Sequence, residues 1–487
     1  MDPAAERRLD ARDRRILVGI VLVAAVLRLV RLDSGLWYDE YAALVEVLRA
    51  PLGQILTTFR GDLQHQLYSI LSRISVSAFG ESAWSIRLVP ALFGIATIPA
   101  LYYLARLSVG RRESLLASAL LAVFYHHVWF SQNGRGYSIM AFFAITATYA
   151  LIRGVRERRL RFFLVYAVLV GLGAFTHLTL VFLAVGQFVV GAWLLVPRSR
   201  HTSPTVWHLA AAFGGAALVT LALYAPVFTQ VIDFFLNRPS QLVGISTPGW
   251  AVAEALRMLR RGLAGGTGAG VVAVGLVFGL GAWDFLRRRP LEFWLFSTPV
   301  AVTIAGALMA RGTMYPRFFF FLIGFLVLFL VRGAMITGSL AARAVRRAAW
   351  GERAGTTFVV VPILTSLGAL VVGYYPHPKQ GYAEAVAFAD GRVDAGERVV
   401  AAGSGAWPVF GYFERPFRWI GSAAELDEER SHGDPVWILF TFPRYLENEQ
   451  PEIMRAIDEE CMDTRRFPGT VGDGDLVVCA LPPLSAG

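Results

Sequence analysis

The sequence predicts a polytopic α-helical membrane protein with about eleven transmembrane helices and a small C-terminal α/β domain. Of the 487 residues, 55% are hydrophobic and 17% are charged, whereas soluble domains are close to half apolar and a quarter charged. Many apolar runs are nearly free of charge and about 18 or more residues long, which is enough to cross a bilayer core. The arginines stand in short clusters between these runs, a pattern typical of membrane proteins and not of nucleic-acid-binding proteins.

The predicted membrane part covers residues 1–375. Its first apolar run lacks a small-residue cleavage site, so we interpret it as a retained span and not as a signal peptide. The predicted spans are residues 14–32, 86–107, 114–130, 137–152, 161–176, 178–196, 207–228, 268–286, 291–310, 316–333 and 356–375.

The arginine distribution predicts the orientation in the cell membrane. The N-terminus and the loops on the same side of the predicted spans hold 23 Arg, whereas the short loops on the other side hold three. Because short cytoplasmic loops carry the excess of Arg, we expect the N-terminus to be cytoplasmic. An odd number of spans then places the C-terminal domain and the long segments 33–85 and 229–267 outside.

Segment 33–85 differs from an ordinary loop. It contains the amphipathic stretches "YAALVEVLRAPLGQILTTF" and "HQLYSILSRISVSAF", which are too short to span and are expected to lie on the membrane surface.

The predicted C-terminal domain, residues 376–487, is acidic, with 19 Asp and Glu against 10 Lys and Arg. "ERVVAAG", "PVWILFTF" and "DLVVCAL" are typical of buried strands, and "YAEAVAFADG" predicts a helix that ends at Gly391. No catalytic motif stands out here. Cys461 and Cys479 could form a disulfide in an oxidising compartment if the chain between them folds as a strand pair; two free thiols are the alternative.

Two motifs of the outer segment carry candidate acids. Asp39 and Glu40 lie in "GLWYDEYAAL", and Asp62 and His65 lie in "GDLQHQLYSIL". An acid held at the membrane surface and partly desolvated can serve as a general base. The alternative is an aromatic belt beside solvated acids.

Candidate anion-binding residues lie at the outer ends of predicted spans. Arg135 and Tyr137 belong to "WFSQNGRGYSI", Arg317 to "RGTMYPRFFFFLIGF" and His177 to "AFTHLTLV". Arginine suits a phosphate because it stays charged and presents a planar fork of donors. The alternatives are membrane-anchoring arginines and a hydrogen-bonded interfacial histidine.

These motifs, in this order, resemble the dolichyl-phosphate-mannose protein mannosyltransferase-like branch of the GT-C glycosyltransferases, which also includes the aminoarabinose transferases acting on lipid A. The resemblance covers roughly residues 35–330. The matching pieces are "WYDEYA", the Asp-His-Leu-Tyr pattern of residues 62–71, "ESAWSIRLVPALFG", "SQNGRGYS", "THLTL" and "YPRFFF".

The resemblance implies that Asp39 is the catalytic base with Glu40 beside it, and that His65, Arg135, Tyr137 and Arg317 lie near the phosphate of a lipid carrier. Two pieces depart from the family. His65 is followed by Gln-Leu where the family has Pro-Pro, and Asn-Gly replaces the usual Glu-Ala before the Arg of "SQNGRGYS". We assign no cofactor, and a divalent cation stays an unassigned alternative.

The function expected from these features is transfer of a sugar, with inversion, from a polyprenyl-phosphate carrier to an acceptor at the outer face of the membrane. The partners are then the lipid-linked donor, an acceptor of unknown class and membrane lipids. The alternative is a flippase or transporter for the same carrier, although ion-coupled transporters usually keep ionisable residues within their spans. A nucleotide-sugar donor is disfavoured because the longest predicted cytoplasmic loop, residues 332–355, is too short for a nucleotide-binding domain.

Overall fold

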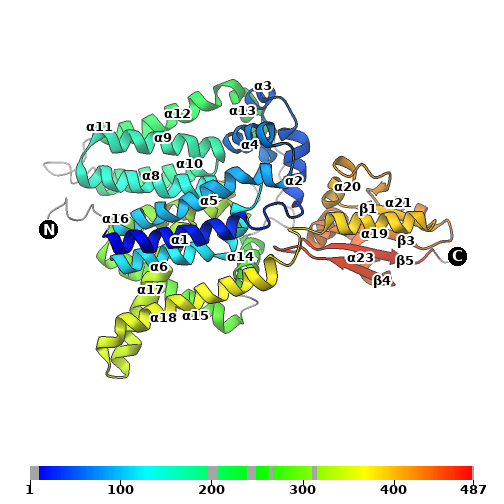
Figure 1. Ribbon diagram of the computed structural model, residues 1–487. Coiled ribbons are helices and arrows are strands. Elements are labelled where there is room, and N and C mark those ends of the chain that lie inside the picture. Colours follow the sequence, from blue (N-terminus) through cyan, green and yellow to red (C-terminus); the bar gives the residue numbers. More distant parts are fainter. Residues whose placement is uncertain (1–9, 196–205, 238–247, 263–266, 310–314, 485–487) are drawn as a thin grey trace.

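A bundle of long helices forms one end of the molecule and a β-sheet forms the other (Figure 1). The structure is a computed structural model and describes residues 10–195, 206–237, 248–262, 267–309 and 315–484. The helices of the bundle run alongside one another, and the first of them, α1 (Ala11–Leu29), begins at the end far from the sheet (Figure 1).

The bundle has a helix at each of the eleven predicted spans. Its principal helices are α1 (Ala11–Leu29), α5 (Ala83–Arg106), α6 (Arg111–Val123), α7 (Tyr125–Ser131), α8 (Tyr137–Glu157), α9 (Leu160–Thr176), α10 (Leu180–Leu195), α11 (Val206–Leu209), α12 (Gly215–Tyr224), α13 (Phe228–Leu236), α14 (Pro248–Gly262), α15 (Gly268–Arg288), α16 (Pro290–Met309), the 3₁₀ segment η6 (Pro316–Leu322), α17 (Ile323–Ala344) and α18 (Gly351–Ala369).

Not every one of these helices is long and apolar enough to cross a bilayer. Within the described residues, seven helical stretches meet that requirement, and the pair α6–α7, bent by 58°, would make an eighth. Helices α9 and α10 are apolar but shorter, and α1 begins with four charged residues at positions 12–15. The polytopic helical fold is therefore present, while the number of eleven spans stays a prediction.

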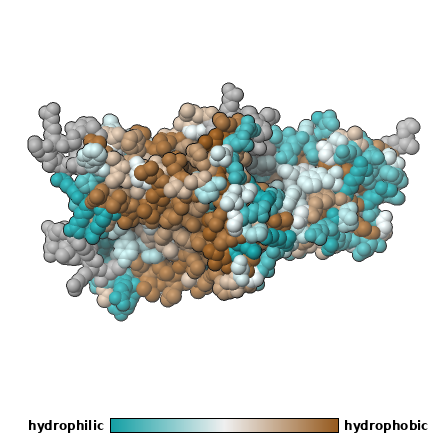
Figure 2. Space-filling view, turned by 90° about the horizontal axis from the view of Figure 1, so that it is seen from above, coloured by the Kyte–Doolittle hydropathy of each residue, from teal (hydrophilic) through white to brown (hydrophobic). Residues whose placement is uncertain are grey.

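The face of the bundle seen in Figure 2 is apolar across its middle. Hydrophilic residues gather at the end far from the sheet and over the sheet itself. Large side chains such as Leu22, Leu218, Leu276 and Leu364 are more than half exposed on this surface. A belt of exposed apolar side chains on a helical bundle is the surface that lipid tails cover.

Segment 33–85 folds at the end of the bundle that faces the sheet (Figure 1). Its two amphipathic stretches are helical, as predicted, and form α2 (Tyr38–Ala43), the π-helical turn Leu44–Leu48, α3 (Leu52–Thr57) and α4 (Gln66–Phe79). The short turn Gly61–Leu63 joins α3 to α4. Their position at a membrane surface stays a prediction.

The C-terminal part contains a five-stranded sheet in the order β2-β1-β3-β5-β4. Strand β1 is parallel to β2 and β3, whereas β5 is antiparallel to β3 and β4. The strands are β1 (Arg398–Ala402), β2 (Arg418–Ile420), β3 (Val436–Thr441), β4 (Asp463–Phe467) and β5 (Leu476–Leu481), and the helices are α19 (Tyr382–Asp394), α20 (Trp407–Gly411), α21 (Ala423–Arg430), α22 (Pro443–Glu449) and α23 (Pro451–Glu460).

The three predicted strands are β1, β3 and β5, which are almost wholly buried. The two edge strands were not predicted. Strand β2 has only three residues, and β4 has the polar sequence DTRRF and is exposed. The predicted helix end at Gly391 is wrong: α19 continues to Asp394. The residue with positive φ that follows this helix is Gly396, at +84°.

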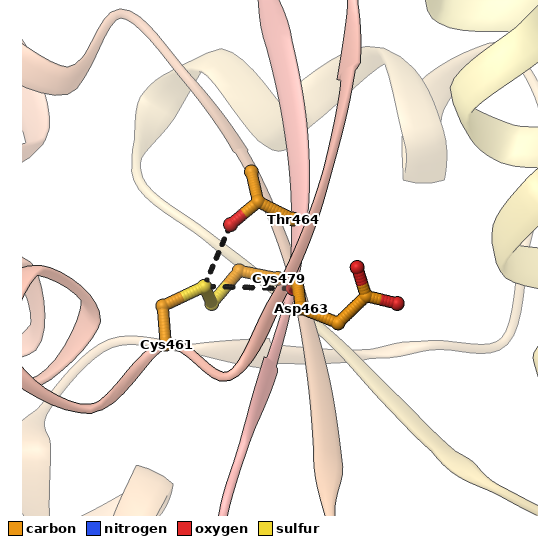
Figure 3. The surroundings of a disulfide bond; sticks show 4 residues. All are labelled: Cys461, Asp463, Thr464 and Cys479. Atoms are coloured by element: carbon orange, nitrogen blue, oxygen red, sulfur yellow. Dashed lines mark hydrogen bonds between the residues drawn. A yellow bond between two sulfur atoms is a disulfide. The ribbon is translucent and has the colours of Figure 1, made fainter.

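Cys461 and Cys479 are joined by a disulfide (Figure 3), and their Cα atoms are 5.9 Å apart. The strands β4 and β5 form the antiparallel pair that brings the two residues together. Cys479 is buried within β5, whereas Cys461 is partly exposed before β4.

We expect neither cysteine to react with an alkylating reagent in protein purified without reductant. After reduction, Cys461 is expected to react before the buried Cys479. Replacing Cys479 by Ala is expected to lower the free energy of unfolding by roughly 2–4 kcal/mol, as is typical for a lost disulfide. Mass spectrometry that finds both residues alkylated without reduction would contradict the pairing.

Candidate active site

A cavity of about 510 Å³ lies between the helical bundle and the sheet. One side is lined by residues at the start of α2, in α7 and α8, in α14 and at the start of η6. The other side is lined by residues that follow β1, by α22 and by the loop 471–473. Two parts of the chain that are distant in sequence therefore form one site.

Asp39 and Arg317 meet in this cavity. Asp39 Oδ2 lies 3.1 Å from Arg317 Nη1, and the side chains are 17% and 34% exposed. The Arg317 guanidinium lies 4.4 Å from the ring centroid of Tyr315, and its buried Nε has no hydrogen-bond partner among the described residues. The sequence thus placed both residues in candidate motifs, and the structure brings a carboxylate and a cation with a spare donor into one cavity.

Glu40 does not line the cavity, although the sequence suggests a catalytic role for it. It is fully buried, and its carboxylate accepts hydrogen bonds from Arg87 Nε and Nη2 at 2.7 and 2.6 Å. It also accepts from the backbone N–H groups of Trp37 at 2.9 Å and Gly134 at 2.5 Å. Successive helical residues point about 100° apart, so Asp39 faces the cavity while Glu40 faces the bundle and fixes the start of α2.

The charge of Glu40 is held by two buried cations. Burial by itself would raise the pKa of Glu40, but Arg87 and Lys379 outweigh it and lower that pKa to about 2. Lys379 donates to the carbonyls of Trp129 at 3.1 Å and Gln132 at 2.6 Å, and burial lowers the pKa of its ammonium group. The sequence analysis did not identify either residue as a partner of Glu40. Two features could have drawn attention to them: Lys379 is the single Lys of the chain, and Arg87 lies at the start of an apolar span.

Arg135 is buried beside the cavity and is not one of its lining residues. Its Nη1 donates to the carbonyl of Leu63 at 2.7 Å, and its Nη2 donates to the carbonyl of Asp62 at 2.5 Å. Backbone carbonyls thus engage both Nη groups, while the buried Nε has no hydrogen-bond partner among the described residues. Contact between Arg135 and a phosphate stays a prediction. The side chain of Asp62 is exposed and also lies outside the cavity lining.

His65, Tyr137 and His177 form a packed group of rings. The His65 ring centroid lies 5.2 Å from that of Tyr137 and 4.6 Å from that of His177, and His65 Nδ1 accepts from the Gly136 N–H at 2.8 Å. Burial, followed by the charge of Arg135, lowers the pKa of His65 and lowers that of His177 to about 3. Both rings are neutral near pH 7 and supply no positive charge for a phosphate. Of these three residues, only Tyr137 lines the cavity.

The second wall of the cavity was not foreseen, because no sequence motif marks it. Arg444 Nη1 lies 2.8 Å from Glu254 Oε2, and Arg444 Nε donates to Asp473 Oδ2 at 2.8 Å. This ion-pair group joins α14 of the bundle to the loops of the sheet.

Thr470 connects the two parts a second time. Its carbonyl accepts from the Tyr125 hydroxyl at 2.6 Å, and its Oγ1 accepts from Trp129 Nε1 at 2.9 Å. These buried hydrogen bonds hold the sheet against α7 and so maintain the cavity. Among the described residues, no group of three or more His, Cys, Asp or Glu could hold a metal ion.

Comparison with known sequences gives one family match. The model for dolichyl-phosphate-mannose-protein mannosyltransferase matches residues 67–228, a region that contains neither Asp39 nor Arg317. A putative mannosyltransferase, YkcB of Bacillus subtilis (strain 168), is 24% identical over 152 residues, which are 31% of this chain and 21% of that protein. The alignment therefore spans about a fifth of the curated relative.

Solved structures match nearly the whole chain. ArnT from Cupriavidus metallidurans in the apo state has a TM-score of 0.58 at 15% identity and covers 96% of this chain and 98% of its own. The same protein bound to undecaprenyl phosphate has a TM-score of 0.54 at 14% identity, covering 95% and 97%. The Archaeoglobus fulgidus oligosaccharyltransferase in the apo form has a TM-score of 0.50 at 13% identity, covering 92% and 72%. The family model thus matches about a third of the chain, and nearly the whole chain shares the fold of ArnT and of the archaeal oligosaccharyltransferase.

Proposed function

We propose that the protein transfers a sugar from a polyprenyl-phosphate donor to an acceptor hydroxyl at the outer face of the membrane. The observation that carries the proposal is the Asp39–Arg317 pair, a carboxylate and a guanidinium in one cavity, which suit the roles of general base and phosphate-binding cation. The fold shared with ArnT bound to undecaprenyl phosphate supports the choice of donor, and the arginine distribution supports the outer face.

The reaction we infer is a single displacement with inversion. The acceptor oxygen forms a bond to the anomeric carbon while the bond from that carbon to the phosphate oxygen breaks. Asp39 takes the proton of the acceptor hydroxyl, and the lipid phosphate leaves with the bonding electron pair. Because the phosphate leaves as an anion, a fixed positive charge beside it lowers the barrier.

Arg317 is the cation best placed to receive the phosphate. It holds Asp39 through one Nη group, and its Nε has no partner among the residues described. The other arginine of the cavity, Arg444, is already engaged by Glu254 and Asp473. A phosphate at Arg317 would compete with Asp39 for the guanidinium and so leave the carboxylate free to act as a base.

The flippase alternative accounts for less of the geometry. A flippase moves the lipid-linked sugar without breaking a bond, so it needs no base beside the cation that binds the lipid phosphate. The carboxylate of Asp39 would only compete with that phosphate for Arg317. Release of free sugar or glycosylated product from vesicles supports the transferase, whereas movement of intact donor between leaflets supports the flippase.

We expect the purified protein in liposomes to transfer sugar from polyprenyl-phosphate sugars and not from nucleotide sugars. The amphiphilic donor can place its tail along the apolar surface of the bundle and its phosphate at Arg317, which lies in the first turn of the helical stretch Pro316–Ala344. Labelled mannose, glucose and arabinose donors of both kinds would be compared by release of label from the donor. Efficient transfer from a nucleotide sugar without a lipid carrier would contradict the proposal.

A further inference from the structure

The sheet contributes its own binding surface to the cavity. Ser404 and Gly405 follow the carboxyl end of β1, and Phe442 and Tyr445 follow the carboxyl end of β3; all four line the cavity that holds Asp39. Phe442 adopts a φ of +53°, a conformation that costs energy for a bulky residue and is found at functional sites more often than elsewhere.

This position is the one at which open α/β sheets bind ligands. Strands β1 and β3 are parallel neighbours, but the helices that follow them pack on opposite faces of the sheet. Val409 of α20 belongs to the same buried cluster as Ala401, whereas Leu446 of α22 belongs to a second cluster with Val400, the neighbouring residue of β1 that points to the other face. The two chain segments diverge there and leave a crevice outside the carboxyl ends of the strands, which is the usual ligand site of such sheets.

The charges of this wall disfavour an anionic ligand. Arg444 is the cation of the wall and faces the carboxylates of Glu254 and Asp473. Glu449 adds a third carboxylate, which accepts from the N–H and the hydroxyl of Ser404 at 3.3 and 3.1 Å. Counting Glu254, which faces Arg444 from α14 on the bundle side, three acids stand against this one cation. The resulting excess of hydrogen-bond acceptors suits a ligand that carries hydroxyl donors and disfavours a phosphate at this wall.

Aromatic rings surround these polar groups. Tyr445 lies 6.0 Å from Phe442 and 6.5 Å from both Trp250 and Tyr315, measured between ring centroids. Aromatic faces pack against the C–H faces of sugar rings, while carboxylates and amides bind the hydroxyls at their rims. A rigid aromatic wall with a few polar groups is also the common form of small-ligand sites.

The architecture disfavours an extended peptide. Peptides are often bound as an added strand on an exposed sheet edge. The edge strands here are β2 and β4, and neither contributes a residue to the cavity lining. Backbone groups of an edge are therefore not presented to a ligand in this cavity.

We propose that the crevice at the ends of β1 and β3 is an acceptor subsite for a neutral saccharide, with Tyr445 and Glu449 as its specificity-determining residues. The saccharide hydroxyl that is glycosylated points to Asp39 across the cavity. This inference rests on the proposed function and adds the class of acceptor to it.

The test uses the full-length protein in liposomes with polyprenyl-phosphate mannose, glucose and arabinose as donors. The acceptors are a neutral oligosaccharide, the same oligosaccharide carrying a phosphate, and a Ser/Thr-containing peptide. Both transfer to the acceptor and hydrolysis of the donor by water are recorded. We expect transfer to the neutral oligosaccharide and much less to the other two.

Glu449→Gln is expected to raise the acceptor KM about tenfold, as loss of a charge-assisted hydrogen bond does, and to leave the donor KM near its original value. Glu447→Gln is the matched control, because Glu447 lies on the same helix, is exposed and is outside the cavity lining. Its acceptor KM should equal that of the unmodified protein.

Four outcomes would overturn the inference. Preferred transfer to the peptide or to the phosphorylated acceptor would assign another acceptor class. A higher donor KM in Glu449→Gln with an unchanged acceptor KM would make the crevice a donor site. Donor hydrolysis with no transfer to any saccharide would remove the acceptor subsite but keep the proposed function, whereas neither hydrolysis nor transfer from any of the three donors would remove both.

Discussion

Asp39→Asn is expected to lower the rate of sugar transfer by roughly 10²–10⁴-fold, the loss typical of a missing general base. The asparagine keeps the size of the side chain and can still accept a hydrogen bond from Arg317, but it cannot take a proton. Asp39 lies in the first turn of α2 and is partly exposed, so the fold should tolerate the change. The measurement is turnover of the lipid-linked donor at saturating substrate.

Asp62→Asn serves as the comparison for this variant. Asp62 belongs to the same segment of the chain, but its side chain is exposed and outside the cavity lining. We expect its turnover to stay close to that of the unmodified protein. A large loss in Asp62→Asn together with near-normal turnover in Asp39→Asn would move the base to Asp62 and contradict the site.

Arg87→Met is expected to lower the free energy of unfolding by about 3–5 kcal/mol, because it leaves the buried carboxylate of Glu40 without its main partner. The side chains of Arg87 and Glu40 are 1% and 0% exposed. Arg87 also donates to the carbonyls of Leu32, Ser34 and Gly35. Thermal unfolding of the protein in detergent would measure the loss, together with the yield of folded protein.

The exposed ion pair between Arg49 and Glu81 provides a matched control. These side chains are 42% and 37% exposed, and exposed pairs contribute about 0–1 kcal/mol. Arg49→Met should therefore shift the unfolding temperature little. Adding Glu40→Gln to Arg87→Met should recover part of the stability, because no unpaired charge then stays buried. Equal melting of Arg87→Met and Arg49→Met would contradict the structural role of the Arg87–Glu40 pair.

The sequence alone determined the fold class. Crossing a bilayer requires long, nearly uncharged helical runs. Such runs can be recognised from the local amino-acid composition alone. A helix is accordingly present at each predicted span, and the three buried strands of the sheet were recognisable from their apolar runs. The edge strands β2 and β4 were not recognisable, because a short or exposed strand carries no hydrophobic pattern.

The candidate site was predictable only in part. Motif order pointed to Asp39, Tyr137 and Arg317, and all three line the cavity. It pointed equally to Arg135 and His65, which are buried beside the cavity with backbone partners. Arginines at the ends of apolar runs cannot be told apart in the sequence. They differ in their hydrogen-bonding and charged partners, which come from distant parts of the chain.

Tertiary structure decided between neighbours of equal chemistry. Asp39 and Glu40 are adjacent acids, and local sequence treats them alike. The helical turn points one toward Arg317 in the cavity and the other toward Arg87 in the bundle, 278 and 47 residues away along the chain. The sheet likewise became part of the site only by docking against α7 and α14. Apolar patterning determines which segments are helices or strands. The role of a charged side chain depends on its protonation and hydrogen bonding, and these are set by contacts with residues far away in the sequence.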